Sequence, residues 1–339
     1  MTIETGNPFS GERLQQIKQF LEAQELRYEE PVDYTVLLLD EEKIIGTGSA
    51  NRNVLKCLAV DPAYRGQNLL GQILTELTMH FYSEGITHYF GFTKPKNDYL
   101  FLSMGLYEVV RTEDVLLLEN RRDGLSKYLK KIGKETEQTK ESAAPGKGDA
   151  IGCIVAHANP FTLGHRYLIE KASEECRWLH VFILSESGSE IPAEDRYRLV
   201  QEGTKDLSNV ILHKASDYLV SPATFPTYFI KEQARADEIN CGLDVKLFGS
   251  RIAPVLGITR RYLGTEPNCG VTSAYNEILK RELPNYGVEV REIERMQINE
   301  EPISASKVRE ACMMADWGKI EKSVPPATLQ YLKKHFSGV

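Results

Sequence analysis

The second half of the chain alternates short apolar runs with segments in which apolar residues recur every three or four positions. The short runs predict buried strands, and the periodic segments predict amphipathic helices. The predicted strands span 152–156, 179–184, 210–213, 244–249 and 288–292, and the predicted helices span 165–176, 194–204, 225–239, 272–282 and 304–315. Such alternation is typical of a parallel sheet with helices on both faces. The sequence therefore predicts a Rossmann-like, doubly wound α/β fold for this half.

The first half follows a different pattern. An amphipathic helix at 10–26 precedes short apolar runs, partly of period two, which predict a meander of strands. These strands span 34–39, 43–49 and 53–60, and a helix at 70–81, a strand at 87–92 and a last strand pair within 106–118 come after them. We therefore expect an α+β domain here.

A polar tract separates the two patterns. Residues 121–132 have the spacing of a short basic helix, and residues 133–149 are rich in charged residues and punctuated by Pro and Gly. Such a tract cannot bury a core of its own. We therefore expect a first domain at 1–132, a linker at 133–149 and a second domain at 150–339.

Bulk composition narrows the classes of function. The 339 residues carry a net charge of −7, which argues against a dominant nucleic-acid surface because such surfaces are usually basic. No apolar run approaches the roughly 18 residues of a membrane span, and the N-terminus lacks the features of a signal peptide. The six cysteines stand singly, without the spacing of a zinc site. We expect a cytoplasmic protein with no metal-ligating cluster and with neither nucleic acid nor membrane as a partner.

Residues 159–165, Asn-Pro-Phe-Thr-Leu-Gly-His, join the first predicted strand of the second half to its helix. The first N–H groups of a helix lack backbone partners and lie at the positive end of its dipole, so the N–H groups near Gly164 would bind a phosphate. His165 begins the inward-facing stripe of the helix and would point into the crevice above the strand ends. The alternative is a helix-capping Thr162 and a histidine that bonds a nearby carbonyl. The turn consists of Asn159, Pro160 and Phe161.

A second polar segment, Ile-Ser-Ala-Ser-Lys-Val-Arg, spans residues 303–309. Ser304 is a natural helix N-cap after a proline, and two hydroxyls with two cations in one helical turn suit a polyphosphate. The residues concerned are Ser304, Ser306, Lys307 and Arg309. An ordinary capped helix is the alternative.

Two loops after predicted strands could supply further contacts. Gly249 and Arg251 follow the fourth strand and could hold adenosine, and the loop 185–189 follows the second and could meet ribose or a small acid. Ordinary polar loops are the alternative for both.

The two polar segments together resemble the paired signature of the nucleotidylyltransferase superfamily, with Thr162 where its first histidine often stands. With Glu-Asp-Arg at 194–196 and Val-Thr-Ser-Ala-Tyr-Asn at 271–276, the chain from about residue 150 to 339 resembles more closely the citrate lyase ligase family. The resemblance implies an ATP-dependent acid–thiol ligase that activates acetate as acetyl-AMP and releases pyrophosphate. It then acetylates the thiol of the CoA-derived prosthetic group on the acyl carrier subunit of citrate lyase.

The resemblance also implies roles for the site residues. Thr162 and the N–H groups near Gly164 would hold the α-phosphate, and His165 would donate to an oxygen that gains charge in the transition state. The departing pyrophosphate, bridged by Mg²⁺, would be held by Ser304, Ser306, Lys307 and Arg309.

The first 125 residues or so resemble the GNAT acetyltransferase fold, whose loop N–H groups hold the pyrophosphate of coenzyme A. The matching loop here runs from Arg65 to Gly71, but Asn68 and Leu70 replace the small residues of that family. Asparagine tolerates positive φ, whereas leucine adds bulk. A pocket for a CoA-like arm at Arg65, Gly66, Asn68 and Gly71, a purely structural domain and a working acetyltransferase are all open alternatives.

The acceptor also has alternatives. A related acetate–ATP ligase acting on tRNA would need a basic groove, and a plain nucleotidylyltransferase would use a small-molecule acceptor instead of acetate. A protein that is non-catalytic, or that works only through its first domain, would catalyse no ATP–pyrophosphate exchange. On the ligase interpretation, the basic residues Lys127, Lys130, Lys131 and Lys134 could steer an acidic carrier protein.

Overall fold

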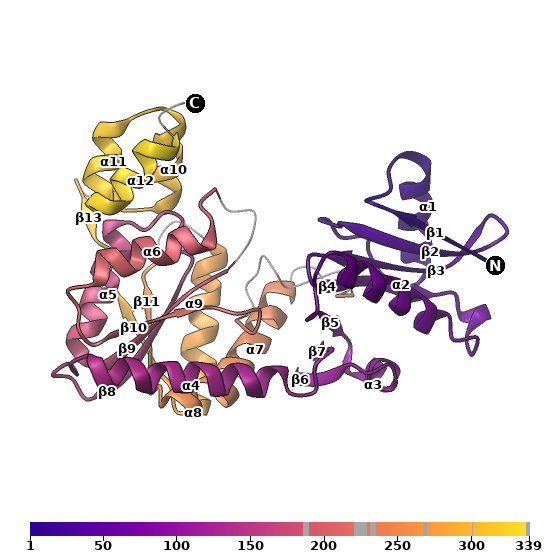
Figure 1. Cartoon of the computed structure of the whole chain (residues 1–339), viewed down its shortest axis with the longest axis horizontal. Coiled ribbons are helices and arrows are strands. Elements are labelled where there is room, and N and C mark those ends of the chain that lie inside the picture. Colours follow the sequence, from indigo (N-terminus) through magenta and orange to yellow (C-terminus); the bar gives the residue numbers. More distant parts are fainter. Residues whose placement is uncertain (186–189, 220–228, 231–234, 267–269, 300, 337–339) are drawn as a thin grey trace. The chain divides into compact units, whose positions relative to one another are not determined.

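The computed structural model describes residues 1–185, 190–219, 229–230, 235–266, 270–299 and 301–336, which form two compact units (Figure 1). The N-terminal unit contains Met1–Leu125 with Phe225–Leu243. The C-terminal unit contains Ser126–Thr224 with Asp244–Val339.

The N-terminal unit is built on a seven-stranded sheet of order β1-β2-β3-β4-β5-β7-β6. Its strands are β1 (Thr2–Gly6), β2 (Tyr34–Asp40), β3 (Lys43–Asn51), β4 (Val54–Val60), β5 (Phe90–Thr93), β6 (Tyr107–Arg111) and β7 (Leu116–Glu119), and its helices include α1 (Gly11–Ala23), α2 (Leu69–Ser83) and α3 (Asp98–Ser103). Neighbouring strands are antiparallel except β4 and β5, which pair in parallel only at Val54 and Leu55. The expected meander and the α+β class are confirmed.

Helix α2 packs on this sheet through an apolar face that includes Ile73 and Leu77. Glycine in β3 makes the close approach possible, because a Cβ atom at Gly48 would lie 2.4 Å from Cγ2 of Ile73. Asn68 caps the helix with a φ of 56°, the left-handed conformation expected for it.

The C-terminal unit is built on a five-stranded, all-parallel sheet of order β10-β9-β8-β11-β12. The strands are β8 (Ala150–Ala156), β9 (Cys176–Ile183), β10 (Val210–Lys214), β11 (Arg260–Gly264) and β12 (Glu289–Ile293). The chain runs outward from β8 to β10 and then returns to the other side of β8 for β11. The C-terminal ends of β8 and β11 therefore form the switch point at which open α/β sheets bind ligands.

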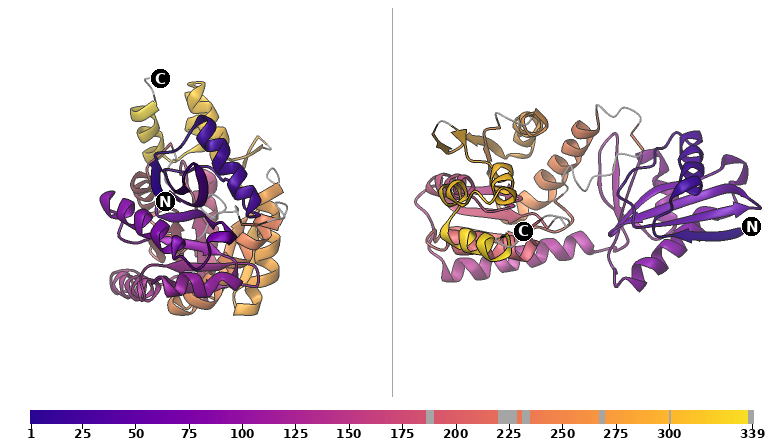
Figure 2. Two further views of the ribbon diagram at one scale, coloured as in Figure 1. Left: turned by 90° about the vertical axis from the view of Figure 1, so that its right-hand side faces the viewer. Right: turned by 90° about the horizontal axis from the view of Figure 1, so that it is seen from above.

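Helices cover both faces of this sheet (Figure 2). They include α4 (Gly124–Ser142), α5 (Leu163–Glu175), α6 (Ala193–Thr204), the last turn of α7 (Ala236–Leu247), α8 (Ala253–Leu256), α9 (Gly270–Glu282), α10 (Ala305–Met313), α11 (Trp317–Ser323) and α12 (Pro326–Phe336). The core on the α5 face joins β8 and β9 to α5, α6 and the last three helices, and Phe161 is fully buried in it. The doubly wound prediction is confirmed. A short hairpin, β13 (Gln297–Ile298) and β14 (Glu301–Pro302), precedes α10.

The strand predicted at 244–249 is wrong. These residues complete α7 and continue into the π-helical turn Phe248–Ile252, and β11 is the fourth strand of the sheet. Leu243, Val245, Leu247 and Phe248 are all buried, and a short buried apolar run has no periodicity that separates a strand from a helix. The helix predicted at 225–239 falls largely outside the described residues.

The tract predicted as a linker is helical over its first part, because α4 continues to Ser142. Ile132 and Thr136 are buried, and Nζ of Lys140 lies 6.0 Å from the ring centre of Trp178. Apolar and amphipathic residues thus recur on one face of the helix, which packs on the C-terminal unit although the segment as a whole is polar.

Candidate active site

A cavity of about 780 Å³ opens at the C-terminal ends of β8 and β11. Thr162, Gly164 and His165 of the first polar segment line it together with Ser304, Ser306 and Lys307 of the second. About 140 residues of chain separate the two segments, and the parallel sheet brings them to one site. The lining therefore combines a helix N-terminus, hydroxyls and a cation, which are the groups that bind phosphates.

Thr162 and His165 fix each other at the start of α5. Oγ1 of Thr162 accepts a hydrogen bond from the backbone N–H of His165 at 3.3 Å, and Nδ1 of His165 accepts one from the N–H of Thr162 at 3.2 Å. A nitrogen that accepts carries no hydrogen, so the neutral ring has its hydrogen on Nε2. The capping alternative considered for these residues is thus present, and it orients the imidazole.

The electrostatic surroundings keep this imidazole neutral. Burial, helped by the nearby charges of Arg295 and His157, lowers the pKa of His165 to about 4. At neutral pH the side chain is a hydrogen-bond donor through Nε2 and not a cation. Such a group can stabilise a phosphate oxygen without a proton transfer.

The turn at residues 159–161 lies next to the site but outside the cavity. Asn159 and Phe161 are buried, the Asn159-Pro160 peptide bond is cis, and neither these two residues nor Pro160 lines the cavity. The side-chain amide of Asn159 donates to Glu190 at 2.7 Å.

Arg309 braces this turn. Its Nη1 donates to the carbonyl oxygen of Asn159 at 2.6 Å, its Nη2 donates to Oγ of Ser306 at 3.4 Å, and its Nε lies 3.4 Å from a carboxylate oxygen of Glu190. The guanidinium therefore ties α10 to the turn before α5, and Arg309 is not among the residues that line the cavity.

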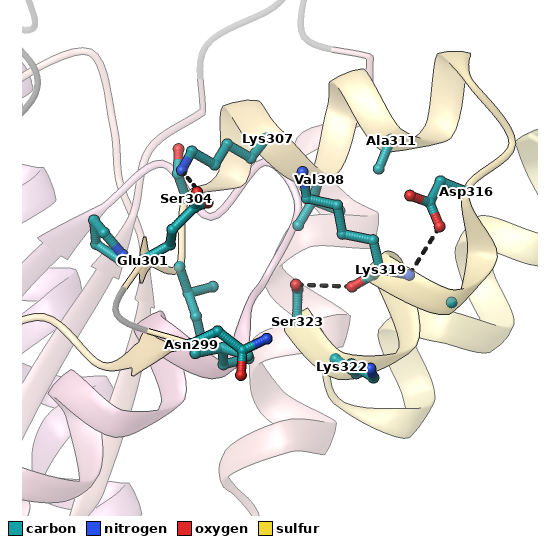
Figure 3. A pocket seen from close by; sticks show the side chains of 14 residues that line it. Asn299, Glu301, Ser304, Lys307, Val308, Ala311, Asp316, Lys319, Lys322 and Ser323 are labelled. Atoms are coloured by element: carbon teal, nitrogen blue, oxygen red, sulfur yellow. Dashed lines mark hydrogen bonds and ion pairs between the residues drawn. The ribbon is translucent and has the colours of Figure 1, made fainter.

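Lys307 lies between the cavity and a second, smaller one of about 480 Å³ (Figure 3). Its Nζ forms an ion pair with Glu301 of the hairpin at 2.8 Å. Ser304 also borders both cavities, and the smaller one continues along α11, where Lys319 and Lys322 are exposed.

The expected contacts of Gly249 and Arg251 with adenosine are not supported, and the reason is the mistaken strand. Both residues lie in the π-helical turn and not at a strand end, and neither lines the cavity. Gly249 packs against Tyr286, since a Cβ atom at this position would lie 2.5 Å from Cγ of that ring. Most of the loop 185–189 lies outside the described residues.

Sequence reasoning assigned no role to several charged groups that the structure brings to the site. Arg196 is fully buried and donates to the carbonyl oxygens of His157 and Ile191, which holds the loop after β8. Asp244 and Arg261 are buried and line the cavity. Asp244 could have been noticed as a charge between the apolar residues Leu243 and Val245, whereas Arg196 and Arg261 each stand beside another charged residue and gave no such signal.

In the N-terminal unit, the loop before α2 contains two residues with positive φ, Gly66 and Asn68. Gly66 has a φ of 84°, and the side chain of Asn68 lies so close to Gly71 that a Cβ atom there would meet Oδ1 at 2.4 Å. Leu70 is half-buried against the core of the unit, and Arg65 is exposed.

Two features are absent from the described part of the chain. It contains no group of three or more His, Cys, Asp or Glu side chains arranged to hold a metal ion. None of its helices has the length and apolar character needed to cross a bilayer.

Comparison with known proteins adds independent findings. The family model of the citrate lyase ligase C-terminal domain matches residues 151–332. The chain is 39% identical over 325 residues to a citrate (pro-3S)-lyase ligase of Klebsiella pneumoniae, covering 94% of this chain and 92% of that protein. It is 39% identical over 327 residues to the protein of the same name from Escherichia coli strain K12, covering 95% and 90%. The structure of an acyl-CoA N-acyltransferase from Pseudomonas aeruginosa aligns with 36% of this chain and all of its own at 9% identity, with a TM-score of 0.31.

Proposed function

The chain belongs to the citrate lyase ligase family, and we propose from this premise that it activates acetate with ATP and transfers the acetyl group to citrate lyase. It is an ATP-dependent ligase, and citrate lyase is its partner. The observation that carries the proposed mechanism is the convergence of two distant phosphate-binding segments on one cavity.

In the first half-reaction, a carboxylate oxygen of acetate attacks the α-phosphorus of ATP. A new P–O bond forms, the bond to the bridging oxygen breaks, and pyrophosphate leaves with the electron pair, giving acetyl-AMP. The N–H groups at the start of α5 would bind the α-phosphate, and Nε2–H of His165 would donate to an oxygen that gains charge. Thr162 would act through His165 as a positioning residue.

Pyrophosphate would be held at the start of α10. Ser304, Ser306 and Lys307 line the cavity there and would contact the β- and γ-phosphates. Arg309 would hold the turn at Asn159 in a fixed position relative to helix α10. Mg²⁺ bound to the nucleotide would neutralise charge on the phosphates.

In the second half-reaction, a thiolate attacks the acetyl carbonyl of acetyl-AMP, a thioester forms and AMP leaves. We infer that the thiol belongs to the CoA-derived prosthetic group of the acyl carrier subunit. The domain of residues 1–132 would bind this arm at a loop that contains Arg65, Gly66, Asn68 and Gly71. The segment 133–149 would connect it to the adenylylating domain at residues 150–339. The exposed lysines of α4 would attract an acidic carrier.

Isotope exchange between pyrophosphate and ATP tests the first half-reaction. With the full-length protein, Mg²⁺ and acetate, label from pyrophosphate should enter ATP, and omission of acetate should abolish it. Restored activity of deacetylated citrate lyase then tests the second half-reaction. Exchange that needs phosphopantetheine or a nucleotide in place of acetate, or acetylation of tRNA in place of the lyase, would overturn the proposal.

A further inference from the structure

A second polar cluster lines the same cavity. Asp244 at the end of α7, Arg261 in β11 and Tyr275 in α9 all line it. Asp244 and Arg261 are each only 3% exposed. The phosphate-binding roles proposed above use none of these three groups.

Because side chains along β11 point to alternate faces of the sheet, this cluster lies on the face opposite the core that packs against α5. Tyr262 belongs to the core on the α5 face, so its neighbour Arg261 points to the opposite face of the sheet. There the guanidinium carbon lies 4.5 Å from the ring centre of Phe248, and the hydroxyl of Tyr275 donates to Asp244. Arg261 is therefore held by a cation–π contact in a fixed, dehydrated setting.

The two polar clusters of the cavity differ in the anion that they suit. The groups from α5 and α10 offer a helix N-terminus, two serines and a lysine, which suit several phosphate groups. In the other cluster, the guanidinium of Arg261 and the carboxyl group of Asp244 lie among a lining that also includes the apolar residues Val155, Leu184 and Leu219. Burial raises the pKa of Asp244, which disfavours its charged form, although the charge of Arg261 acts in the opposite direction. A guanidinium in an apolar lining suits a monoanion with a short apolar tail, since a guanidinium binds a carboxylate through paired N–H groups.

We propose that this Arg261 pocket, formed by Arg261, Tyr275, Val155 and Leu219, binds the carboxylic acid substrate. This inference rests on the proposed function and names the site of its acid. Arg261 holds the carboxylate and directs one oxygen toward the α-phosphate at His165. The apolar wall limits the length of the acyl chain, so the pocket selects acetate over longer acids. Asp244, hydrogen-bonded to Tyr275, fixes the position of the tyrosine.

Substitution of Arg261 tests the cation. In the acetate-dependent exchange assay, Arg261→Lys and Arg261→Gln should raise KM for acetate by about 10- to 100-fold, the usual range for loss of a hydrogen-bonded charge. The Kd for ATP, measured by calorimetry on the same variants, should change less than threefold. Arg260→Lys is the matched control, because the adjacent Arg260 pairs with Glu289 and Glu175 outside the cavity, and KM for acetate should not change.

Substitution of an apolar residue that lines the pocket tests the assignment without removing a buried charge. Leu219→Ala should raise the ratio of kcat/KM for propionate to that for acetate by at least tenfold, because a removed isobutyl group leaves room for a methylene. An unchanged ratio, or an unchanged KM for acetate in a folded Arg261 variant, would overturn the assignment. Equal losses of acetate and ATP binding would overturn it too. If the unmodified protein itself lacks acetate-dependent exchange, the proposed function fails and not merely the pocket.

Discussion

At the scale of single residues, the site depends on how a few side chains are held in position. His165 was expected from its place in the sequence, but its tautomer follows from the N–H of Thr162, which occupies Nδ1. Arg309 was expected to bind pyrophosphate, whereas its hydrogen bond to the carbonyl of Asn159 makes it a brace between two elements. These two residues lead to different kinetic expectations.

Replacing His165 should affect the chemical step more than nucleotide binding. His165→Ala should lower kcat for exchange by about 10²- to 10³-fold, because it removes one donor to the transition state. The Kd for ATP should stay within a few-fold, as measured by calorimetry. Thr162→Ser keeps the capping hydroxyl and serves as the control, with near-normal kcat. Comparable losses in ATP affinity and kcat for His165→Ala would contradict the role.

Arg309 should act jointly with Glu190, because both side chains bond to Asn159. Arg309→Ala and Glu190→Ala should each lower kcat, and the double variant should lose little more than the worse single one. A coupling energy of about 1 kcal/mol or more is expected for residues of one network. The same cycle on KM for ATP should show little coupling. Additive losses, with Glu190→Ala nearly silent, would instead favour direct binding of pyrophosphate by Arg309.

At the scale of elements, the strands of the C-terminal unit carry polar groups that have no role in the proposed reaction. His180 of β9 and His213 of β10 are buried, and Nδ1 of the first lies 2.9 Å from Nε2 of the second. Burial lowers the pKa of His213 to about 4 and places the pKa of His180 well below its ordinary value. Both rings are therefore neutral in the folded protein near pH 7.

This pair should make the protein sensitive to acid. In the unfolded chain histidine titrates near pH 6.5, so between pH 6.5 and about 4 the unfolded state binds more protons and the free energy of unfolding falls as the pH falls. Above pH 6.5 the free energy of unfolding no longer depends on the protonation of these two histidines. His213→Gln keeps a polar partner for His180 but removes one titrating group.

The measurement is urea unfolding at several pH values. His213→Gln should reduce the slope of unfolding free energy against pH by up to about 1.4 kcal/mol per pH unit in this window. His335→Gln, on the exposed end of α12, is the control and should leave the slope unchanged. An unaltered slope in the His213 variant would show that the pair does not titrate on unfolding.

At the scale of the whole molecule, the two units should divide the reaction. The cavity at the C-terminal ends of β8 and β11 lies within the C-terminal unit, and the loop before α2 lies within the N-terminal unit. If this loop binds the CoA-derived arm, activation of acetate and transfer of the acetyl group can be separated by mutation.

Arg65→Ala removes an exposed cation from this loop. Acetate-dependent exchange should stay within twofold of the unmodified protein, whereas the KM for deacetylated citrate lyase should rise about tenfold, as for a lost charge-assisted contact. Arg122→Ala, also exposed in the N-terminal unit, is the control. If Arg65→Ala leaves both half-reactions unchanged, the loop does not take part in binding the arm.

Local patterns of periodicity, capping and charge were enough to predict the alternation of strands and helices, the two kinds of fold and the two polar segments at 159–165 and 303–309. Only the tertiary structure decided that residues 244–252 are helical, that α4 continues to Ser142 and that Arg309 braces a turn. It alone also brought Arg261 and Asp244 to the cavity. The physical reason is that a short buried run fits either backbone conformation, and the partner of a buried charge is chosen by packing between segments far apart in the chain.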